Sequence, residues 1–252
     1  MDINNYIFED SLTYRFLYDK KKSILEILIN GYFDIENNKY VENDCTLVIK
    51  NWSIAKGCKS ADKHLDDIKY SFGLANTIIW ISSSKKDNRN ILEMEVETFD
   101  GRLVYWYFEN PTIELIMTRP IKKKNVRNMN VANCEFIDYR CSRFFYDQDN
   151  SLLEITFDSY FDKELYKEVD KECTLVIKGW SNAKGKLIKD RFYGNIDYHM
   201  GFIETITDFK FEKKEEVTLL TMIVNTSDKR SVFWRFKNPS IEFIVDNVPQ
   251  TL

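Results

Sequence analysis

The chain has 252 residues, of which 44% are hydrophobic and 30% charged, and its formal net charge is −4. With only 8 Gly and 4 Pro it lacks the composition of a disordered or collagen-like protein. No apolar run approaches the ~20 residues of a membrane span, and the acidic balance is unlike that of a nucleic-acid binder. The N-terminus also lacks the pattern of a signal peptide. We therefore expect a cytoplasmic protein with neither a membrane nor a nucleic-acid partner.

One segment occurs twice in the chain. Cys45–Gly57 returns with small changes as Cys173–Gly185, 128 positions later. The match extends without a gap over residues 8–116 and 136–244, with roughly 45% identity, a period that indicates a duplicated domain rather than a solenoid repeat. The boundaries predicted from this match are copy 1 over residues 1–118, a linker over 119–131 and copy 2 over 132–252.

The first predicted elements of each copy are strands. In copy 2, apolar Leu153, Ile155 and Phe157 alternate with polar residues, the period of a half-buried strand. The Lys20–Lys22 turn and its match Gln148–Asn150 each predict a hairpin. Cys45–Lys50 then predicts a strand with Leu47 and Ile49 on one face and Val48 and Lys50 on the other. A loop of about 15 residues is expected further on in each copy, at Cys58–Phe72 and Lys186–Met200. Long loops in compact domains are often functional or mobile.

The second half of each copy is also read as strands. Thr77–Ser83 predicts one strand, Lys85–Asn90 a polar connection, and Ile91–Glu97 a strand with one buried face. Asp100-Gly101 is typical of a hairpin turn, and the turn at Asn110-Pro111 precedes a last strand. Six to seven antiparallel strands per copy predict a mainly β protein. Its two tandem copies are each expected to be an antiparallel sandwich or partly open barrel, forming a pseudo-symmetric intramolecular dimer.

The candidate binding residues are tryptophans and lysines. Trp80 has no match in copy 2, where Asp208 stands, so it indicates a surface that one copy has and the other lacks. The others are matched between the copies, and each could instead be structural, the tryptophans as core anchors and the lysines in cross-strand ion pairs. The full set of candidates is Lys50, Trp52, Lys56, Trp80, Lys178, Trp180 and Lys184.

No pattern of residues indicates catalysis, a metal site or a cofactor. His64 and His199 both fall in the variable loops, but they are not at matched positions and form no constellation. The five cysteines lack CxxC spacing, and Cys45 and Cys173 are expected to be buried free thiols. We therefore predict a protein that is not an enzyme and has no cofactor.

The plan resembles that of bacterial toxin immunity proteins, the cytoplasmic antidotes of polymorphic or contact-dependent toxins. Three matched patterns carry the resemblance: an early Phe-x-Asp, a Tyr-Asp hairpin and a closing strand. They are Phe8-x-Asp10 and Phe136-x-Asp138, Tyr18-Asp19 and Tyr146-Asp147, and residues 113–116 and 241–244. The resemblance implies a protein that binds and blocks another protein, and the acidic balance would suit a basic toxin domain.

Two other functions stay open at this point. Trp52 and Trp180 could stack on sugar rings in a carbohydrate or small-ligand binding module. The duplicated fold could equally be a structural pseudo-dimer. The sequence favours the protein-binding hypothesis because it combines aromatic-rich strands with a variable loop.

Overall fold

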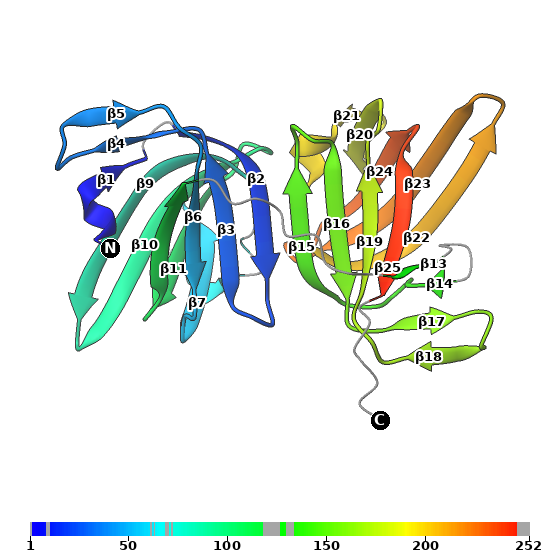
Figure 1. Ribbon diagram of the computed structural model, residues 1–252, viewed down its shortest axis with the longest axis horizontal. Helices are drawn as coiled ribbons and strands as arrows, with labels where there is room; N and C mark the ends of the chain where they lie inside the picture. Colours follow the sequence, from blue (N-terminus) through cyan, green and yellow to red (C-terminus); the bar gives the residue numbers. More distant parts are fainter. Residues whose placement is uncertain are drawn as a thin grey trace. The chain divides into compact units, whose positions relative to one another are not determined.

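The computed structural model describes residues 2–8, 11–60, 62, 64–68, 71, 73–117, 127–129 and 134–245. Asp10, most of the predicted linker and part of the first long loop lie outside these residues. The described part is mainly β, is built of several antiparallel sheets and contains no α-helix (Figure 1). The mainly β class predicted from the alternating patterns is therefore confirmed.

The chain divides into two compact units. Unit 1 comprises Met1–Arg119, Asp197–Phe202 and Ser227–Arg230, and unit 2 comprises Pro120–Ile196, Ile203–Thr226 and Ser231–Leu252. Two short segments from the second half of the sequence thus belong to unit 1. One of them contains most of the 3-10 helix η4 (Ile196–His199), and the other is the turn before β24.

Unit 1 holds the 3-10 helix η1 (Ile3–Asn5) and twelve described strands. The strands are β1 (Tyr6–Ile7), β2 (Ser11–Asp19), β3 (Ile24–Ile29), β4 (Tyr32–Asp34), β5 (Lys39–Val41), β6 (Cys45–Lys50), β7 (Ile54–Lys59), β8 (Asp66–Asp67), β9 (Ala75–Lys86), β10 (Arg89–Thr98), β11 (Leu103–Glu109) and β12 (Thr112–Met117). Strands β9, β10 and β11 lie side by side (Figure 1). They continue through β7 to β8, while β2, β3, β6 and β12 pair in that order, and β2 also pairs with β9.

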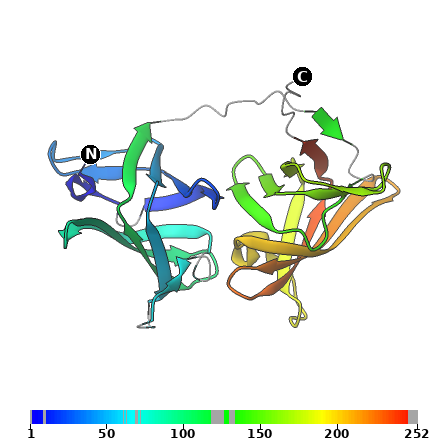
Figure 2. The ribbon, with the colours of Figure 1, turned by 90° about the horizontal axis from the view of Figure 1, so that it is seen from below.

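Unit 2 holds β13 (Arg127–Met129), β14 (Cys134–Glu135), β15 (Cys141–Asp147), β16 (Leu152–Phe157), β17 (Tyr160–Asp162), β18 (Lys167–Val169), β19 (Cys173–Lys178), β20 (Asn182–Leu187), β21 (Gly194–Asn195), β22 (Ile203–Lys214), β23 (Val217–Thr226), β24 (Ser231–Lys237) and β25 (Ser240–Val245). One sheet has the order β21-β20-β24-β23-β22, and Figure 2 shows its long β22–β23 hairpin in orange. A second runs β13-β25-β19-β16-β15, so part of the predicted linker is a strand.

The core of each unit lies under its long strands. In unit 1 the inner positions of β10 and β11 pair as Leu92 with Phe108, Met94 with Trp106 and Val96 with Val104, and all six side chains are fully buried. In unit 2 the residues 128 positions later pair in the same way and are equally buried. Trp106 faces Phe16 of β2, with 6.5 Å between the ring centroids, so the core of unit 1 extends from β11 to β2.

Two local predictions need correction. The Lys85–Asn90 connection is only the two-residue turn Asp87-Asn88, and both residues have positive φ (50° and 62°), as a tight hairpin turn requires. The predicted strand Cys45–Lys50 is β6, in which Val48 is buried as well as Leu47 and Ile49.

The second correction concerns the predicted loop Cys58–Phe72, because its first two residues, Cys58 and Lys59, belong to strand β7. Gly57 stands in β7 because a Cβ there would meet Ser71 Cβ at 2.9 Å and the carbonyl oxygen of Tyr105 at 3.1 Å.

Candidate functional site

The matched tryptophans Trp52 and Trp180 lie at the bends that lead from β6 to β7 and from β19 to β20. Both are half-buried. The ring of Trp52 packs 5.2 Å from that of Phe108 and stacks on Tyr18, and Trp180 packs 5.1 Å from Phe236. One side of each indole therefore anchors the bend against the core.

The matched lysines Lys50 and Lys178 are held in ion pairs. The Nζ atom of Lys50 lies 2.6 Å from Oε1 of Glu114, and the Nζ of Lys178 lies 2.6 Å from Oε1 of Glu242. In each unit the pair joins neighbouring strands, β6 to β12 or β19 to β25. Each lysine is thus already neutralised by a partner within its own sheet.

Trp80 lies on the outer face of β9 in unit 1. Its side chain is 38% exposed, its Nε1 donates a hydrogen bond of 3.0 Å to Oε2 of Glu95, and its ring is 6.1 Å from that of Tyr105. A surface hollow of about 290 Å³ adjoins it, lined by Asn4, Tyr6, Ile7, Phe8, Ile79, Trp80 and Ile81. An exposed aromatic side chain thus lies beside a partly apolar depression.

Three carboxylates accompany Trp80 on the same face. Glu93, Glu95 and Glu97 of β10 alternate with the buried Leu92, Met94 and Val96, so they point away from the core. They pair across the sheet with Tyr107, Tyr105 and Leu103 of β11. We call this surface the acidic face and define it by Trp80, Glu93, Glu95, Glu97, Tyr105 and Tyr107.

Hydrogen bonds hold the acidic face in one arrangement. The hydroxyl of Tyr105 donates to Glu93, and that of Tyr107 donates to Oε1 of Glu109 at 3.0 Å. Burial raises the pKa of Tyr105, and its hydrogen bond to the Glu93 carboxylate raises it further. The tyrosines therefore stay protonated and serve as donors that fix the carboxylates. Lys56 shares this face, opposite Tyr107 on β7.

In the matched sheet of unit 2, the outer positions of β20 and β24 carry positive charge. Lys184 and Lys186 of β20 pair across the sheet with Arg235 and Phe233 of β24, and Lys237 follows on the same side. The ring of Tyr193 packs edge-on against Phe233 at 5.8 Å, and the ammonium of Lys186 lies 5.0 Å from the Tyr193 centroid. We call this surface the basic face and define it by Lys184, Lys186, Tyr193, Phe233, Arg235 and Lys237.

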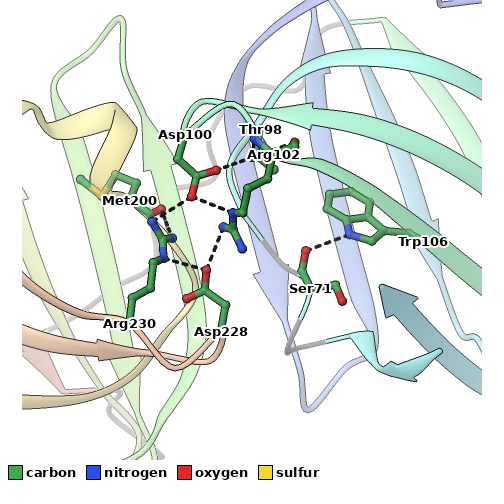
Figure 3. Close-up of polar contacts among 8 residues, drawn as sticks. All are labelled: Ser71, Thr98, Asp100, Arg102, Trp106, Met200, Asp228 and Arg230. Atoms are coloured by element: carbon green, nitrogen blue, oxygen red, sulfur yellow. Dashed lines mark hydrogen bonds and ion pairs between the residues drawn. The ribbon is translucent and has the colours of Figure 1, made fainter. Parts of the chain in front are cut away.

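A four-residue ion cluster lies in unit 1 (Figure 3). Arg102 Nε lies 2.8 Å from Asp100 Oδ2, and Arg230 Nε lies 2.7 Å from Asp228 Oδ2. The cross pairs complete it, with Arg102 Nη2 2.8 Å from Asp228 Oδ2 and Arg230 Nη1 2.9 Å from Asp100 Oδ2. Arg230 also donates to the carbonyl of Met200 at 3.1 Å.

The cluster sets the charge state of Asp100. Burial by itself would raise the pKa of this carboxyl, but hydrogen bonds from Arg102 and Thr98, with the charges of Arg102 and Arg230, outweigh burial and lower it. All four side chains of the cluster are at most 20% exposed. Its ion pairs join the turn that precedes β11 to the turn that precedes β24.

The histidines belong to neither face, whereas the buried Cys58 of β7 lies directly opposite Tyr105 of the acidic face. His64 is 87% exposed and lies 3.4 Å from Asp66, and His199 lies in η4. All five cysteines are free and buried, and burial raises the pKa of Cys134 to about 11 and that of Cys45 to about 12. Within the described residues no three His, Cys, Asp or Glu side chains are grouped to hold a metal, and no helix there is long and apolar enough to cross a membrane.

The predicted site residues therefore divide by position. Trp80 and Lys56 lie on the outer sheet face of unit 1, and Lys184 on that of unit 2, whereas Lys50, Trp52 and their matches belong to the bends and the strand pairing. The glutamates of β10 and the cations of β24 are not among the candidate residues predicted from the sequence. The signal was available: polar positions of an alternating strand share one face.

Comparison with known proteins adds no relative. No family model matches the chain, no curated protein matches it, and no solved structure matches it. We therefore infer the function from the side chains of the acidic face and the basic face.

Proposed function

We propose that this chain is a non-enzymatic protein-binding protein whose acidic face binds a basic protein partner. The single observation that carries the proposal is the surface formed by Glu93, Glu95 and Glu97 with Trp80, Tyr105 and Tyr107. Three carboxylates on one strand would repel each other, and aromatic donors hold two of them in place, Tyr105 on Glu93 and Trp80 on Glu95. Such a preorganised anionic surface favours association with a cationic partner.

The aromatic side chains contribute binding energy in addition to the electrostatic attraction. Tryptophan and tyrosine are the residues that dominate binding energy at protein interfaces, because they bury a large area at little cost in conformational entropy. Trp80 and Tyr105 lie among the carboxylates, and the hollow beside Trp80 could receive an apolar side chain. A partner with lysine or arginine around one apolar residue would fit this face.

The organisation of the chain supports a tandem protein. Nearly every strand of unit 2 has the bounds of a strand of unit 1 shifted by 128 positions, for example β10 at 89–98 and β23 at 217–226. We propose two tandem copies of one antiparallel sandwich or partly open barrel that form a pseudo-symmetric pair. The pairing of β2 with both β3 and β9 supports an opened barrel in copy 1.

The partner that we propose is a toxin domain, and the chain would act as its cytoplasmic immunity protein. Many toxin domains that attack nucleic acids are basic, since they must bind phosphates. A surface of fixed carboxylates can occupy such a site without any catalysis. The resemblance in strand pattern to immunity proteins points to the same class.

The test is protection of cells from a toxin encoded by a neighbouring gene. Co-expression of the native chain should restore growth, and Glu93→Lys with Glu95→Lys should abolish the rescue. The matched control is Thr221→Lys with Ile223→Lys, at the equivalent positions of unit 2, which should still protect. Rescue by the Glu93/Glu95 variant, at an expression level equal to that of the native chain, would refute the role of the acidic face.

A further inference from the structure

The basic face of unit 2 has a charge arrangement that does not stabilise its own sheet. Lys184 and Arg235 stand directly opposite each other on β20 and β24, a like-charge pair that is unfavourable across strands. Lys237 lies on the same side, two residues beyond Arg235. Among the described residues, none of these three cations forms an ion pair with a carboxylate, and all three are exposed. A like-charge pair that destabilises its own sheet indicates that these side chains have a function other than stabilising the sheet.

The acidic face of unit 1 is complementary to this surface. Where one sheet has Glu93, Glu95 and Tyr107, the matched positions of the other have Thr221, Ile223 and Arg235. Each face also carries an aromatic pair, Trp80 with Tyr105 in unit 1 and Tyr193 with Phe233 in unit 2. Both faces belong to sheets of similar strand length, so one can lie on the other with charges and rings in contact.

We propose that the basic face of one molecule docks on the acidic face of a second copy of this chain. Lys184 and Arg235 would pair with Glu93 and Glu95, and the two aromatic pairs would pack at the centre of the contact. The two surfaces differ, so the contact is heterologous: each bound molecule leaves one acidic and one basic face open. The association therefore continues head to tail instead of stopping at a dimer.

The area of the two faces limits the strength of the self-association. A seven-residue strand such as β24 is about 23 Å long, and four neighbouring strands span about 19 Å, so two docked faces cover about 900 Å². Interfaces of that size are transient. Self-association is expected at high micromolar concentrations and low salt, and it should weaken at least about tenfold at 0.5 M NaCl, where charges are screened within a few ångströms.

This inference goes beyond the proposed function but shares its acidic face. A basic partner bound to the acidic face would displace the second copy. The chain would then be held as short polymers, which dissociate when the partner binds. The two ideas are separable, because Lys184 and Arg235 take part in self-association alone. A chain that lacks them should still bind a basic partner.

The experiment measures molar mass by sedimentation equilibrium of the full chain at low and high salt. The native chain should form a concentration-dependent series of oligomers at low salt. Glu93→Lys with Glu95→Lys, and separately Lys184→Glu with Arg235→Glu, should each give monomers. Mixed in equal amounts, these two variants should associate with each other, since the basic face of one fits the acidic face of the other and the two charge-reversed faces fit each other in the same way. The four changes in one chain should restore self-association.

The control for net charge is Lys167→Glu with Lys171→Glu, two exposed lysines outside the basic face, which should self-associate like the native chain. Circular dichroism checks that each variant is folded. A native chain that stays monomeric at low salt would overturn the proposal. So would a Lys184/Arg235 variant that still assembles, a mixture in which the two variants do not associate, or a basic face that binds a single-stranded oligonucleotide in place of a second copy.

Discussion

Strand β11 of unit 1 and strand β24 of unit 2 differ at every outer position and agree at every inner one. The inner residues are Val, Trp and Phe in both, as Val104, Trp106 and Phe108 and again 128 positions later. The outer residues are Leu, Tyr, Tyr and Glu in β11 and Ser, Phe, Arg and Lys in β24. Close packing tolerates little change inside, whereas the outer face is free to change. The two sheets therefore share a core and differ in the chemistry of their outer faces.

The shared core predicts the largest effect. Trp106→Ala and Trp234→Ala each remove a fully buried indole, and each should cost about 3–5 kcal/mol of unfolding free energy. The indole of Trp106 also donates to the carbonyl of Ser71 at 3.3 Å. Equilibrium denaturation by urea measures both losses. A cost below about 1 kcal/mol at either position would contradict equal cores, since that is the level expected of surface sites.

The turns before β11 and β24 keep the same charges, and the cluster that they form is predicted to be structural. Asp100→Asn removes a carboxylate that faces Arg102 and Arg230 and should cost about 2 kcal/mol at pH 7. The folded-state pKa of Asp100 lies below its ordinary value of 3.8. Its contribution is therefore complete above that value and is lost as the pH falls through the folded-state pKa.

The pH dependence of the unfolding free energy tests whether Asp100 makes this contribution. Unfolding free energy measured between pH 6 and pH 2 should fall less steeply for Asp100→Asn than for the native chain. Equal slopes would show that Asp100 does not carry the effect. Thr98→Val retains the carboxylate but removes one of its hydrogen-bond donors, and it should give an intermediate slope.

Trp80 sharpens the contrast between the outer faces. Replacing it by the residue at the matched position, Trp80→Asp, should weaken binding of a basic partner about tenfold, because it removes an exposed aromatic contact. The reciprocal change, Asp208→Trp, should leave that binding unchanged. Isothermal titration calorimetry with the purified partner measures both variants. Equal affinities for Trp80→Asp and the native chain would remove Trp80 from the interface.

The smallest effect on stability is expected for the surface ion pairs that are identical in the two units. Lys50→Ala and Lys178→Ala each break one partly exposed ion pair and should cost under about 1 kcal/mol, by similar amounts. Thermal unfolding in low and high salt measures them, and high salt should shrink both effects. If either substitution abolished partner binding while the chain stayed folded, the lysine would belong to a site rather than to the sheet.

Much of the fold could be predicted because alternation and turn residues are local signals. The strand with Leu92, Met94 and Val96 buried, the Asp100-Gly101 turn and the final strands follow from the pattern of residues alone. Strand β7 could not, since Gly57 is placed by its close approach to Ser71.

The two charged faces were hidden for a different reason. Lys184 and Arg235 are 51 positions apart in the sequence and meet only because β20 pairs with β24. Trp80 was found because it has no match, but its partner Glu95 depends on the register of β9 against β10.

The most direct test of the account is to exchange one outer face for the other. A chain with Trp80→Asp, Glu93→Thr, Glu95→Ile and Tyr107→Arg carries the outer residues of unit 2 on the sheet of unit 1 and retains every core residue. Protection of cells that express the neighbouring toxin is then compared with that given by the native chain. The account predicts complete loss of protection with the unfolding free energy changed by less than about 1 kcal/mol. Full protection by the exchanged chain would contradict it.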